Sequence, residues 1–234
     1  MIRIASSDAA ATAAAAAQWI ASALREAAAA RGTATLALSG GRTPALMIEA
    51  LTKLDLPWAL LRVLQVDERI VPRQDVRLNA SMQRAALVQN GPLPASRFVA
   101  MPVDAADLER AAAQYAQLLG QIDVVHLGLG DDGHTASLVP GDPLLGERDR
   151  LVGISGLYQG TRRMTLTFPA INAARRLVWL VTGQSKTHRL RELLTQAGNS
   201  PALQVRRGGA VVFADDAAAG EADAANGVEP AAGV

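Results

Sequence analysis

Short apolar runs alternate along the chain with longer segments of helical periodicity. The apolar runs, each ended by glycine or polar residues, predict strands near residues 2–4, 33–38, 62–66, 98, 122–127, 151–154, 163–168, 176–181 and 209–213. A long helix is predicted over about 6–30, with Ser6 or Ser7 as its N-cap and Gly32 closing it. Further helices are predicted over about 45–51, 79–88, 104–120 and 187–196, with a short one starting at Pro169. Strands that alternate with helices are typical of a mostly parallel sheet covered on both faces. We therefore expect an open α/β, Rossmann-like fold.

The 234 residues contain no internal repeat and no linker that would divide the chain. We expect one domain over residues 1–216, because a chain of this length can bury a substantial core. Residues 217–234 are rich in alanine, glycine and acidic residues and have almost nothing to bury, so they predict a loose tail. The alanine-rich segment 9–17 is interrupted by Gln18 and Trp19, and we interpret it as part of a helix rather than a signal peptide.

Composition excludes several classes of function. Half of the residues are hydrophobic and 19% are charged, with a net charge of +1, which indicates neither disorder nor an electrostatic basis for binding nucleic acid. Aromatic residues, at 3%, are too few to stack bases, and no membrane span is expected. No cysteine is present, which excludes disulfides and thiolate metal sites and favours a reducing, cytoplasmic location.

The segment 128–140, Gly-Leu-Gly-Asp-Asp-Gly-His-Thr-Ala-Ser-Leu-Val-Pro, carries the richest chemistry of the chain. It follows a predicted buried strand, and its glycines would let the backbone approach a ligand. His134, expected at the start of a following helix, is the kind of side chain best suited to move a proton near neutral pH. A glycine-rich turn after a strand is also common as a plain loop. The combination of Asp132 with His134 favours an active site.

Three further motifs are predicted at the carboxyl ends of strands, where open parallel sheets bind ligands. The turn 39–44 combines a hydroxyl, glycines and a helix start, with Thr43 as N-cap and Pro44 at the first position, and this combination suits a phosphate. Lys186 stands at another helix start, where the helix dipole disfavours a cation, and this favours an anionic ligand. Arg69 follows two acids, and a surface salt bridge explains it equally well.

The three histidines differ in their surroundings. His126 alternates within an apolar strand and is expected in the core, whereas His188 is expected to be solvated on a helix. No HxH or HxxxH spacing is present, so no catalytic metal is expected. No G-x-S-x-G motif is present either, so His134 would act on water rather than on a serine.

The segments LALSGGRTP, VDERIVP, GLGDDGHTASLVP and VTGQSK resemble those of the 6-phosphogluconolactonase family, and the resemblance spans about residues 36–216. The larger group includes glucosamine-6-phosphate deaminase and ribose-5-phosphate isomerase. The resemblance implies an open α/β fold, no cofactor, and hydrolysis of 6-phospho-D-glucono-1,5-lactone to 6-phosphogluconate in the oxidative pentose phosphate pathway. Its only implied partner is this sugar-phosphate lactone, and we expect a monomer or a weak homodimer.

The resemblance also implies roles for individual residues. His134 matches the family's general base, and Asp67 and Asp132 match residues of its pocket. The segments that bind the sugar phosphate contain Ser39, Gly40, Gly41, Arg42, Thr43, Arg69, Asn79, Gly130 and Lys186. One departure concerns the family's usual Asp-Ser-Asn, which is Arg77-Leu78-Asn79 here, so a polar contact from position 78 is in doubt.

Two alternative functions stay open. An aminosugar-phosphate deaminase or isomerase of the same group has a glutamate beside the proline of the histidine motif, which helps to open the sugar ring. Val139 occupies that place and cannot relay a proton. A non-catalytic sugar-phosphate sensor would carry a DNA-binding helix pair, and residues 1–33 contain no such pattern.

Overall fold

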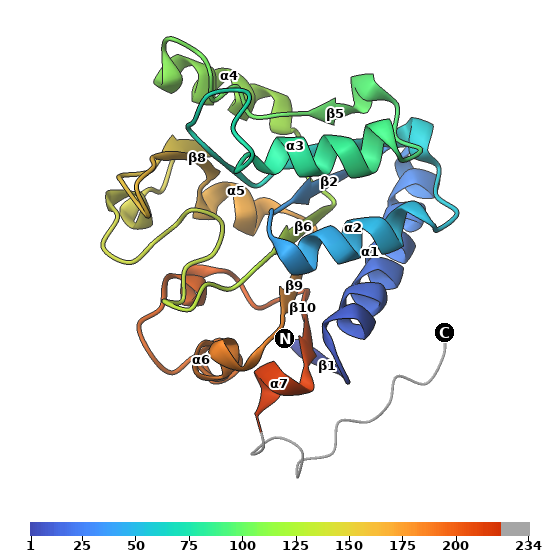
Figure 1. Cartoon of the computed structure of the whole chain (residues 1–234), viewed down its shortest axis with the longest axis vertical. Coiled ribbons are helices and arrows are strands. Elements are labelled where there is room, and N and C mark those ends of the chain that lie inside the picture. The colour runs from blue at the N-terminus through green and yellow to red at the C-terminus, as the bar shows by residue number, and fades with distance from the viewer. Residues whose placement is uncertain (221–234) are drawn as a thin grey trace.

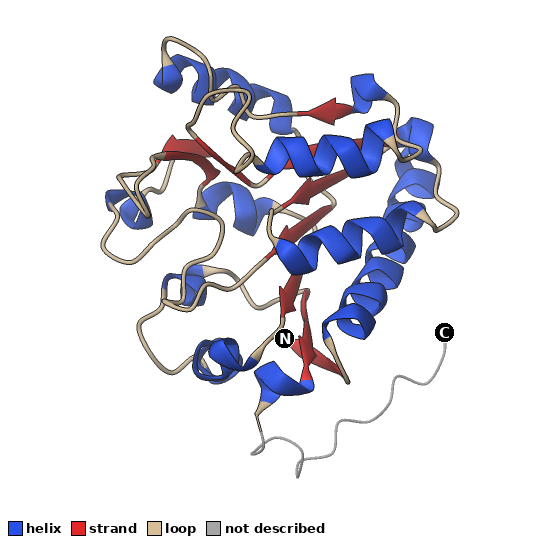
Figure 2. Cartoon of the chain, viewed as in Figure 1, coloured by secondary structure: helices blue, strands red, loops and turns tan. Residues whose placement is uncertain are grey.

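Seven of the nine apolar runs predicted as strands form one parallel sheet that crosses the middle of the molecule (Figure 2). The structure, a computed structural model, describes residues 1–220. In spatial order the strands are β1 (Ile2–Ser6), β10 (Ala210–Asp215), β9 (Arg176–Val181), β6 (Val124–Leu127), β2 (Ala34–Leu38), β3 (Leu61–Gln65) and β5 (Phe98–Val99). The predicted open, mostly parallel α/β sheet is confirmed.

The strand order reverses between β2 and β6, which lie side by side at the centre of the sheet. From β2 the chain proceeds outward to β3 and β5, whereas from β6 it proceeds in the other direction to β9 and β10. The turns that leave β2 and β6 therefore diverge. A crevice at the carboxyl ends of these two strands is the usual ligand position in such a sheet.

Helices cover both faces of the sheet and enclose two separate hydrophobic cores (Figure 1). One face is covered by α1 (Ala9–Arg31), α2 (Arg42–Thr52) and α3 (Asn79–Arg84), which continues into a π-helical turn (Ala85–Gln89). The other face is covered by α4 (Leu108–Leu119), α5 (Phe168–Ala173), α6 (Thr187–Thr195) and α7 (Asp216–Ala219). Single 3-10 turns occur at Trp58–Leu60, Ala95–Arg97, Pro143–Gly146, Gln184–Lys186 and Pro201–Gln204.

A second, antiparallel sheet of three strands lies beside the first. Two of its strands match the runs predicted at 151–154 and 163–168, but their pairing in a separate sheet was not predicted. It consists of β4 (Asp67–Arg69), β8 (Arg163–Leu166) and β7 (Val152–Ile154), in that order. The sequence pattern suggests that the strand at 62–66 runs straight into residues 67–69. Instead the chain leaves the parallel sheet after Gln65, and Arg69 pairs with Arg163 in the second sheet. Pairing between segments so far apart leaves no local periodicity to detect.

Two predicted helix starts are wrong. Helix α1 is capped by Asp8, whose carboxylate accepts from the Ala11 amide at 2.8 Å, while Ser6 belongs to β1. Helix α2 already begins at Arg42, so Thr43 lies inside its first turn and cannot be the N-cap. The predicted end of α1 at Gly32 is confirmed, with a left-handed φ of 71°.

The helix expected directly after His134 is also wrong, because residues 128–142 form successive turns. Gly133 and Ala136 both have positive φ, 84° and 53°, which a right-handed helix cannot contain. Thr135 and Leu138 close a tight turn by an isolated bridge. His134 therefore lies in an irregular loop.

The C-terminal prediction is only partly covered by the structure. Residues 216–219 form α7, whereas the predicted tail beyond residue 220 lies outside the described residues. None of the helices within residues 1–220 is long and apolar enough to cross a bilayer.

The buried histidine of β6 generates a stability prediction. His126 is fully buried, neither ring nitrogen has a hydrogen-bond partner, and burial lowers its pKa from 6.5 to about 3. The unfolded chain therefore binds one more proton between these pH values, so His126 lowers the stability of the fold as the pH falls from 6.5 toward 3. His126→Leu should reduce the pH dependence by on the order of 1 kcal/mol per pH unit, measured by urea unfolding from pH 7 to pH 4.

His188→Gln is the matched control, because the His188 side chain is 73% exposed on α6. It should leave the slope of unfolding free energy against pH unchanged. An equally steep slope in His126→Leu would contradict the prediction.

Candidate active site

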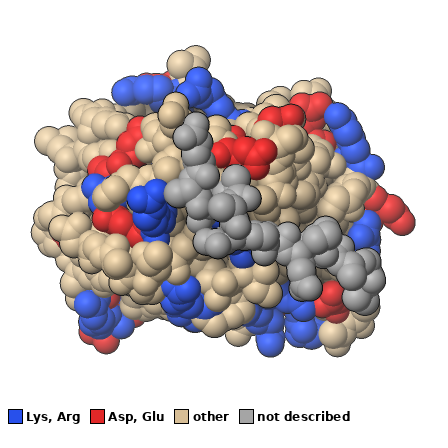
Figure 3. All heavy atoms as spheres, turned by 90° about the horizontal axis from the view of Figure 1, so that it is seen from below, with Lys and Arg blue, Asp and Glu red and all other residues tan. Residues whose placement is uncertain are grey.

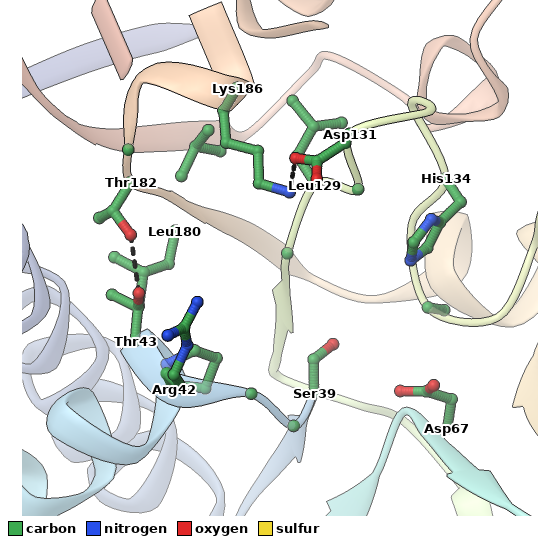
Figure 4. Close-up of a pocket in the computed structure, with 18 of the residues that line it drawn as sticks. Ser39, Arg42, Thr43, Asp67, Leu129, Asp131, His134, Leu180, Thr182 and Lys186 are labelled. Atoms are coloured by element: carbon green, nitrogen blue, oxygen red, sulfur yellow. Dashed lines mark hydrogen bonds and ion pairs between the residues drawn. The ribbon is translucent and has the colours of Figure 1, made fainter. Parts of the chain in front are cut away.

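A cavity of about 710 Å³ opens at the carboxyl ends of β2, β6 and β9, where the strand order reverses. Figure 4 shows residues of the turn after β2, the loop after β6 and the turn after β9 pointing into it. Its walls include every predicted site residue: Ser39, Gly40, Gly41, Arg42, Thr43, Asp67, Arg69, Asn79, Gly130, Asp132, His134 and Lys186. The structure therefore gathers the four sequence motifs into one site.

The turn after β2 forms one wall. The Ser39 hydroxyl donates to the His126 carbonyl at 3.0 Å, which fastens this turn to β6. Gly41, with φ of 121°, allows the sharp entry into α2, and the first turn of that helix faces the cavity. Amide groups at a helix start have no partner within the helix and attract anions. Thr43 contributes elsewhere, because its hydroxyl is bonded to that of Thr182 at 2.7 Å.

His134 and Asp132 form a close pair in the opposite wall. His134 Nδ1 lies 2.5 Å from Asp132 Oδ1, and the same oxygen accepts from the His134 amide at 3.1 Å. The loop is closed by a bond from the Gly130 amide to the His134 carbonyl at 2.8 Å. Because Nδ1 faces the carboxylate, Nε2 is the nitrogen left to exchange a proton with a ligand.

The surroundings of Asp132 keep it ionised. Burial raises the pKa of this carboxyl, but hydrogen bonds from the His134 amide and ring and from the Tyr158 hydroxyl outweigh burial, and the pKa lies below its ordinary value. An ionised Asp132 holds the proton of His134 on Nδ1 and stabilises the imidazolium when the ring takes a second proton.

The strand β4 brings Asp67 and Arg69 to the floor of the cavity. Asp67 Oδ2 accepts from the Ser137 hydroxyl at 2.6 Å, which ties β4 to the histidine loop. Arg69 donates to the Asn79 side chain at 3.0 Å, and Asn79 in turn donates to the Asp67 carbonyl at 3.0 Å. Asn79 therefore acts as a spacer that fixes both charged residues.

Glu68, between them, has a structural role. It is fully buried and accepts from the Gln65 side chain and from the amides of Arg69, Asn79 and Ala80 at 2.7–2.9 Å. Burial raises the pKa of this carboxyl in spite of these four hydrogen bonds. It fastens the start of α3 to β4, and it does not line the cavity.

Lys186 has a partner that the sequence does not suggest. Its ammonium lies 2.6 Å from Asp131 Oδ1 (Figure 4). The same oxygen accepts from the Ser185 hydroxyl at 2.9 Å. The hydrogen bond from Lys186 and that from Ser185 lower the pKa of Asp131. The lysine is thus held at the rim by an exposed acid, Asp131.

Two residues of the site are missing from the prediction. Arg163 on β8 is only 6% exposed, and Tyr158 precedes it in the loop between β7 and β8. The register of the second sheet places Arg163 directly opposite Arg69. A charged residue at the start of an apolar strand is only a weak sequence signal for a site residue. The antiparallel pairing is what shows that Arg163 faces the cavity.

Position 78 resolves the departure from the family pattern. Leu78 is 7% exposed and packs in the same hydrophobic core as α4, so it offers a hydrophobic contact where the resemblance implies a serine. Within residues 1–220, no three His, Asp or Glu side chains are grouped so that they could hold a metal ion.

Comparison with known proteins agrees with this geometry. The family described as glucosamine-6-phosphate isomerases/6-phosphogluconolactonase matches residues 7–213. A 6-phosphogluconolactonase of Synechocystis is 39% identical over 205 residues, which is 82% of this chain and 85% of that protein. The chain belongs to this family. The predicted resemblance and the expectation of a lactone-hydrolysing enzyme are confirmed.

Solved structures show the same fold. A 6-phosphogluconolactonase from Shewanella baltica is 28% identical, with a TM-score of 0.81 over 92% of this chain and 97% of that one. A monomeric glucosamine-6-phosphate deaminase, 22% identical, has a TM-score of 0.83 over 94% and 99% of the two chains. Because lactonase and deaminase share this fold, the fold alone does not distinguish the two activities.

Gly130 generates a prediction about the histidine loop. A Cβ added there would overlap the His134 ring and Asp132 Oδ1. Gly130→Ala should therefore displace the pair and lower kcat roughly 10²-fold, as expected for a misplacement of about 1 Å. Steady-state assays would measure the loss, and Gly146→Ala, where the added Cβ meets nothing within 4 Å, is the control. Wild-type kcat in Gly130→Ala would show that the pair's position is unimportant.

Proposed function

We propose that the protein hydrolyses 6-phospho-D-glucono-1,5-lactone to 6-phosphogluconate, with His134 as the base that activates water. The observation that carries the proposal is the His134–Asp132 pair, at 2.5 Å, in a cavity bordered by Arg69, Arg163 and Lys186. A cavity with one base and several cations suits a neutral reacting group attached to a phosphate dianion. The family membership and the lactonase relatives support the same substrate.

In the proposed reaction, His134 Nε2 accepts a proton while the water oxygen attacks the lactone carbonyl carbon. Asp132 holds the ring through Nδ1 and stabilises the imidazolium that forms. The bond between the carbonyl carbon and the ring oxygen then breaks, and His134 returns the proton to that oxygen as it becomes a hydroxyl. Asp67 has one carboxylate oxygen on Ser137, and its other oxygen can orient a sugar hydroxyl.

The phosphate would lie between the cations and the turn after β2. Arg69 and Arg163 are register neighbours, and like charges placed directly opposite repel each other unless an anion lies between them. Lys186 and the first turn of α2 face the cavity from other walls (Figure 4). Binding energy from the phosphate, remote from the reacting carbon, would fix the carbonyl against the water.

Two alternatives have less support. For an aminosugar-phosphate deaminase, the ring-opening glutamate is replaced by Val139, which is 5% exposed and packed in the protein. For a nucleic-acid-linked sensor, a concentrated basic surface would be required. The face in Figure 3 instead shows acidic and basic side chains interspersed. A cytoplasmic location and a monomer or weak homodimer stay predictions.

A two-substrate assay tests the proposed function. Purified protein should hydrolyse freshly generated phosphorylated lactone faster than the spontaneous reaction and should release no ammonia from glucosamine 6-phosphate. Ammonia release without lactone hydrolysis would support the deaminase instead.

His134→Asn should lower kcat roughly 10²- to 10⁴-fold, because asparagine cannot act as the base. The KM for the phosphorylated lactone should change little, since the phosphate is bound by other residues. The matched control is His188→Asn, on the exposed surface of α6. A folded His134→Asn enzyme with wild-type turnover would show that another residue is the base.

Substitution of the cations tests the phosphate site. Lys186→Ala and Arg69→Ala should each lower kcat/KM for the phosphorylated lactone roughly 10- to 100-fold, the cost of a charge-assisted hydrogen bond. Activity on unphosphorylated gluconolactone should change little, because that substrate lacks the group. Lys53→Ala is the control, since Lys53 is an exposed lysine paired with Glu49 on α2. Equal losses on both substrates would contradict the assignment.

A further inference from the structure

The loop between β7 and β8 carries a tyrosine directly into the histidine site. The Tyr158 hydroxyl donates to Asp132 Oδ2 at 2.9 Å and lies 3.5 Å from His134 Nδ1. The loop is fixed by a bridge from Tyr158 to Thr161, with hydrogen bonds of 2.9 and 3.2 Å in both directions. Positive φ angles at Gln159 and Gly160 close this turn. Tyr158 is thus presented from a constrained turn.

Tyr158 occupies the one oxygen of Asp132 that His134 leaves unused. Oδ1 is bonded to the ring and amide of His134, whereas Oδ2 is bonded to Tyr158. The Asp132 side chain is 34% exposed. If only Oδ1 were bonded, the carboxylate could rotate about the Cβ–Cγ bond, because this torsion of aspartate has no sharply preferred angle. With both oxygens held, the plane of the carboxylate is fixed, and with it the orientation of the His134 ring.

The ring of Tyr158 connects the base to a cation of the same cavity. It meets the His134 ring edge to face, with centroids 5.3 Å apart. The Arg163 guanidinium lies over the Tyr158 ring, 4.9 Å from its centroid. Burial lowers the pKa of this arginine, and the aromatic face offers it a favourable contact in place of water. One side chain therefore contacts three residues that line the cavity.

We propose that Tyr158 is a positioning residue of the lactonase reaction. Its hydroxyl fixes the Asp132–His134 pair, and its ring fixes Arg163 toward the phosphate. This rests on the proposed function, in which His134 is the base. The two contacts are separable, because phenylalanine keeps the ring and removes the hydroxyl, whereas leucine removes both.

Tyr158→Phe tests the hydroxyl. It should lower kcat roughly 10- to 100-fold, the loss of one hydrogen bond to a charged group, with KM for the phosphorylated lactone nearly unchanged. Removing the hydroxyl also takes a hydrogen-bond donor away from the Asp132 carboxylate. The charge of Asp132 then favours the protonated His134 ring more strongly, although the ring is less well oriented, so the acid limb of kcat/KM should move to higher pH. The other charged groups near Tyr158 are Asp131 and Arg163, and both are retained in the variant.

Tyr158→Leu tests the ring. In addition to the loss in kcat, it should raise KM for the phosphorylated lactone roughly 3- to 10-fold, because Arg163 loses the aromatic surface. KM for unphosphorylated gluconolactone should not rise with it. A general loosening of the loop would not raise KM for the phosphorylated lactone alone.

Tyr115→Phe is the matched control. Tyr115 is fully buried on α4, and its hydroxyl is bonded to backbone atoms of Gln65, away from the cavity. Its removal should lower the melting temperature while kcat and the pH profile of the folded enzyme stay those of the wild type.

The outcomes separate this proposal from the proposed function. If His134→Asn is inactive and Tyr158→Phe keeps the wild-type kcat and acid limb, the positioning role is refuted while the base assignment stands. A Tyr158→Phe variant that changes only KM would also overturn it, because the hydroxyl would then contact substrate. If His134→Asn keeps full turnover, the proposed function fails first, whatever Tyr158 does.

Discussion

The site depends on the parallel pairing of β2 and β6 at the centre of the sheet. Both strands end at the same edge, and the chain then turns away in opposite directions, so neither turn can cover the other. The bond from the Ser39 hydroxyl to the His126 carbonyl holds the two strand ends together. The helix start that would receive the phosphate and the loop that carries the base are thereby fixed on opposite walls of one cavity.

The second sheet brings charged residues to the cavity that the parallel sheet does not supply. Leaving the main sheet after Gln65, the chain forms β4 and brings Asp67 and Arg69 beneath the cavity. Glu68 makes this departure stable, since its buried carboxylate accepts four hydrogen bonds from β3, β4 and the start of α3. Pairing with β8 then places Arg163 and the loop of Tyr158 against the same cavity. The second sheet therefore supplies both positive charge for the cavity and the tyrosine proposed to position the base.

Much of this arrangement can be predicted from the sequence, because local patterns determine it. Apolar runs that end in glycine or charged residues marked the strand ends, and the rule for parallel sheets placed their motifs together. Arg163 and Tyr158 could not be found in this way, because their position depends on an antiparallel pairing across about 95 residues. The helix expected after His134 failed because two left-handed residues, one of them Ala136, interrupt it. The partner of Lys186 likewise appears only when the loop after β6 meets the turn after β9.

The pH dependence of kcat/KM for the wild-type enzyme tests the central claim most directly. It would be measured on freshly generated 6-phosphogluconolactone and corrected for spontaneous hydrolysis at each pH. A single histidine base that must be neutral to accept a proton predicts hydrolysis well above the spontaneous rate, falling about tenfold per pH unit on the acid side. Hydrolysis no faster than the spontaneous reaction, or a rate independent of pH across the acid range, would contradict it.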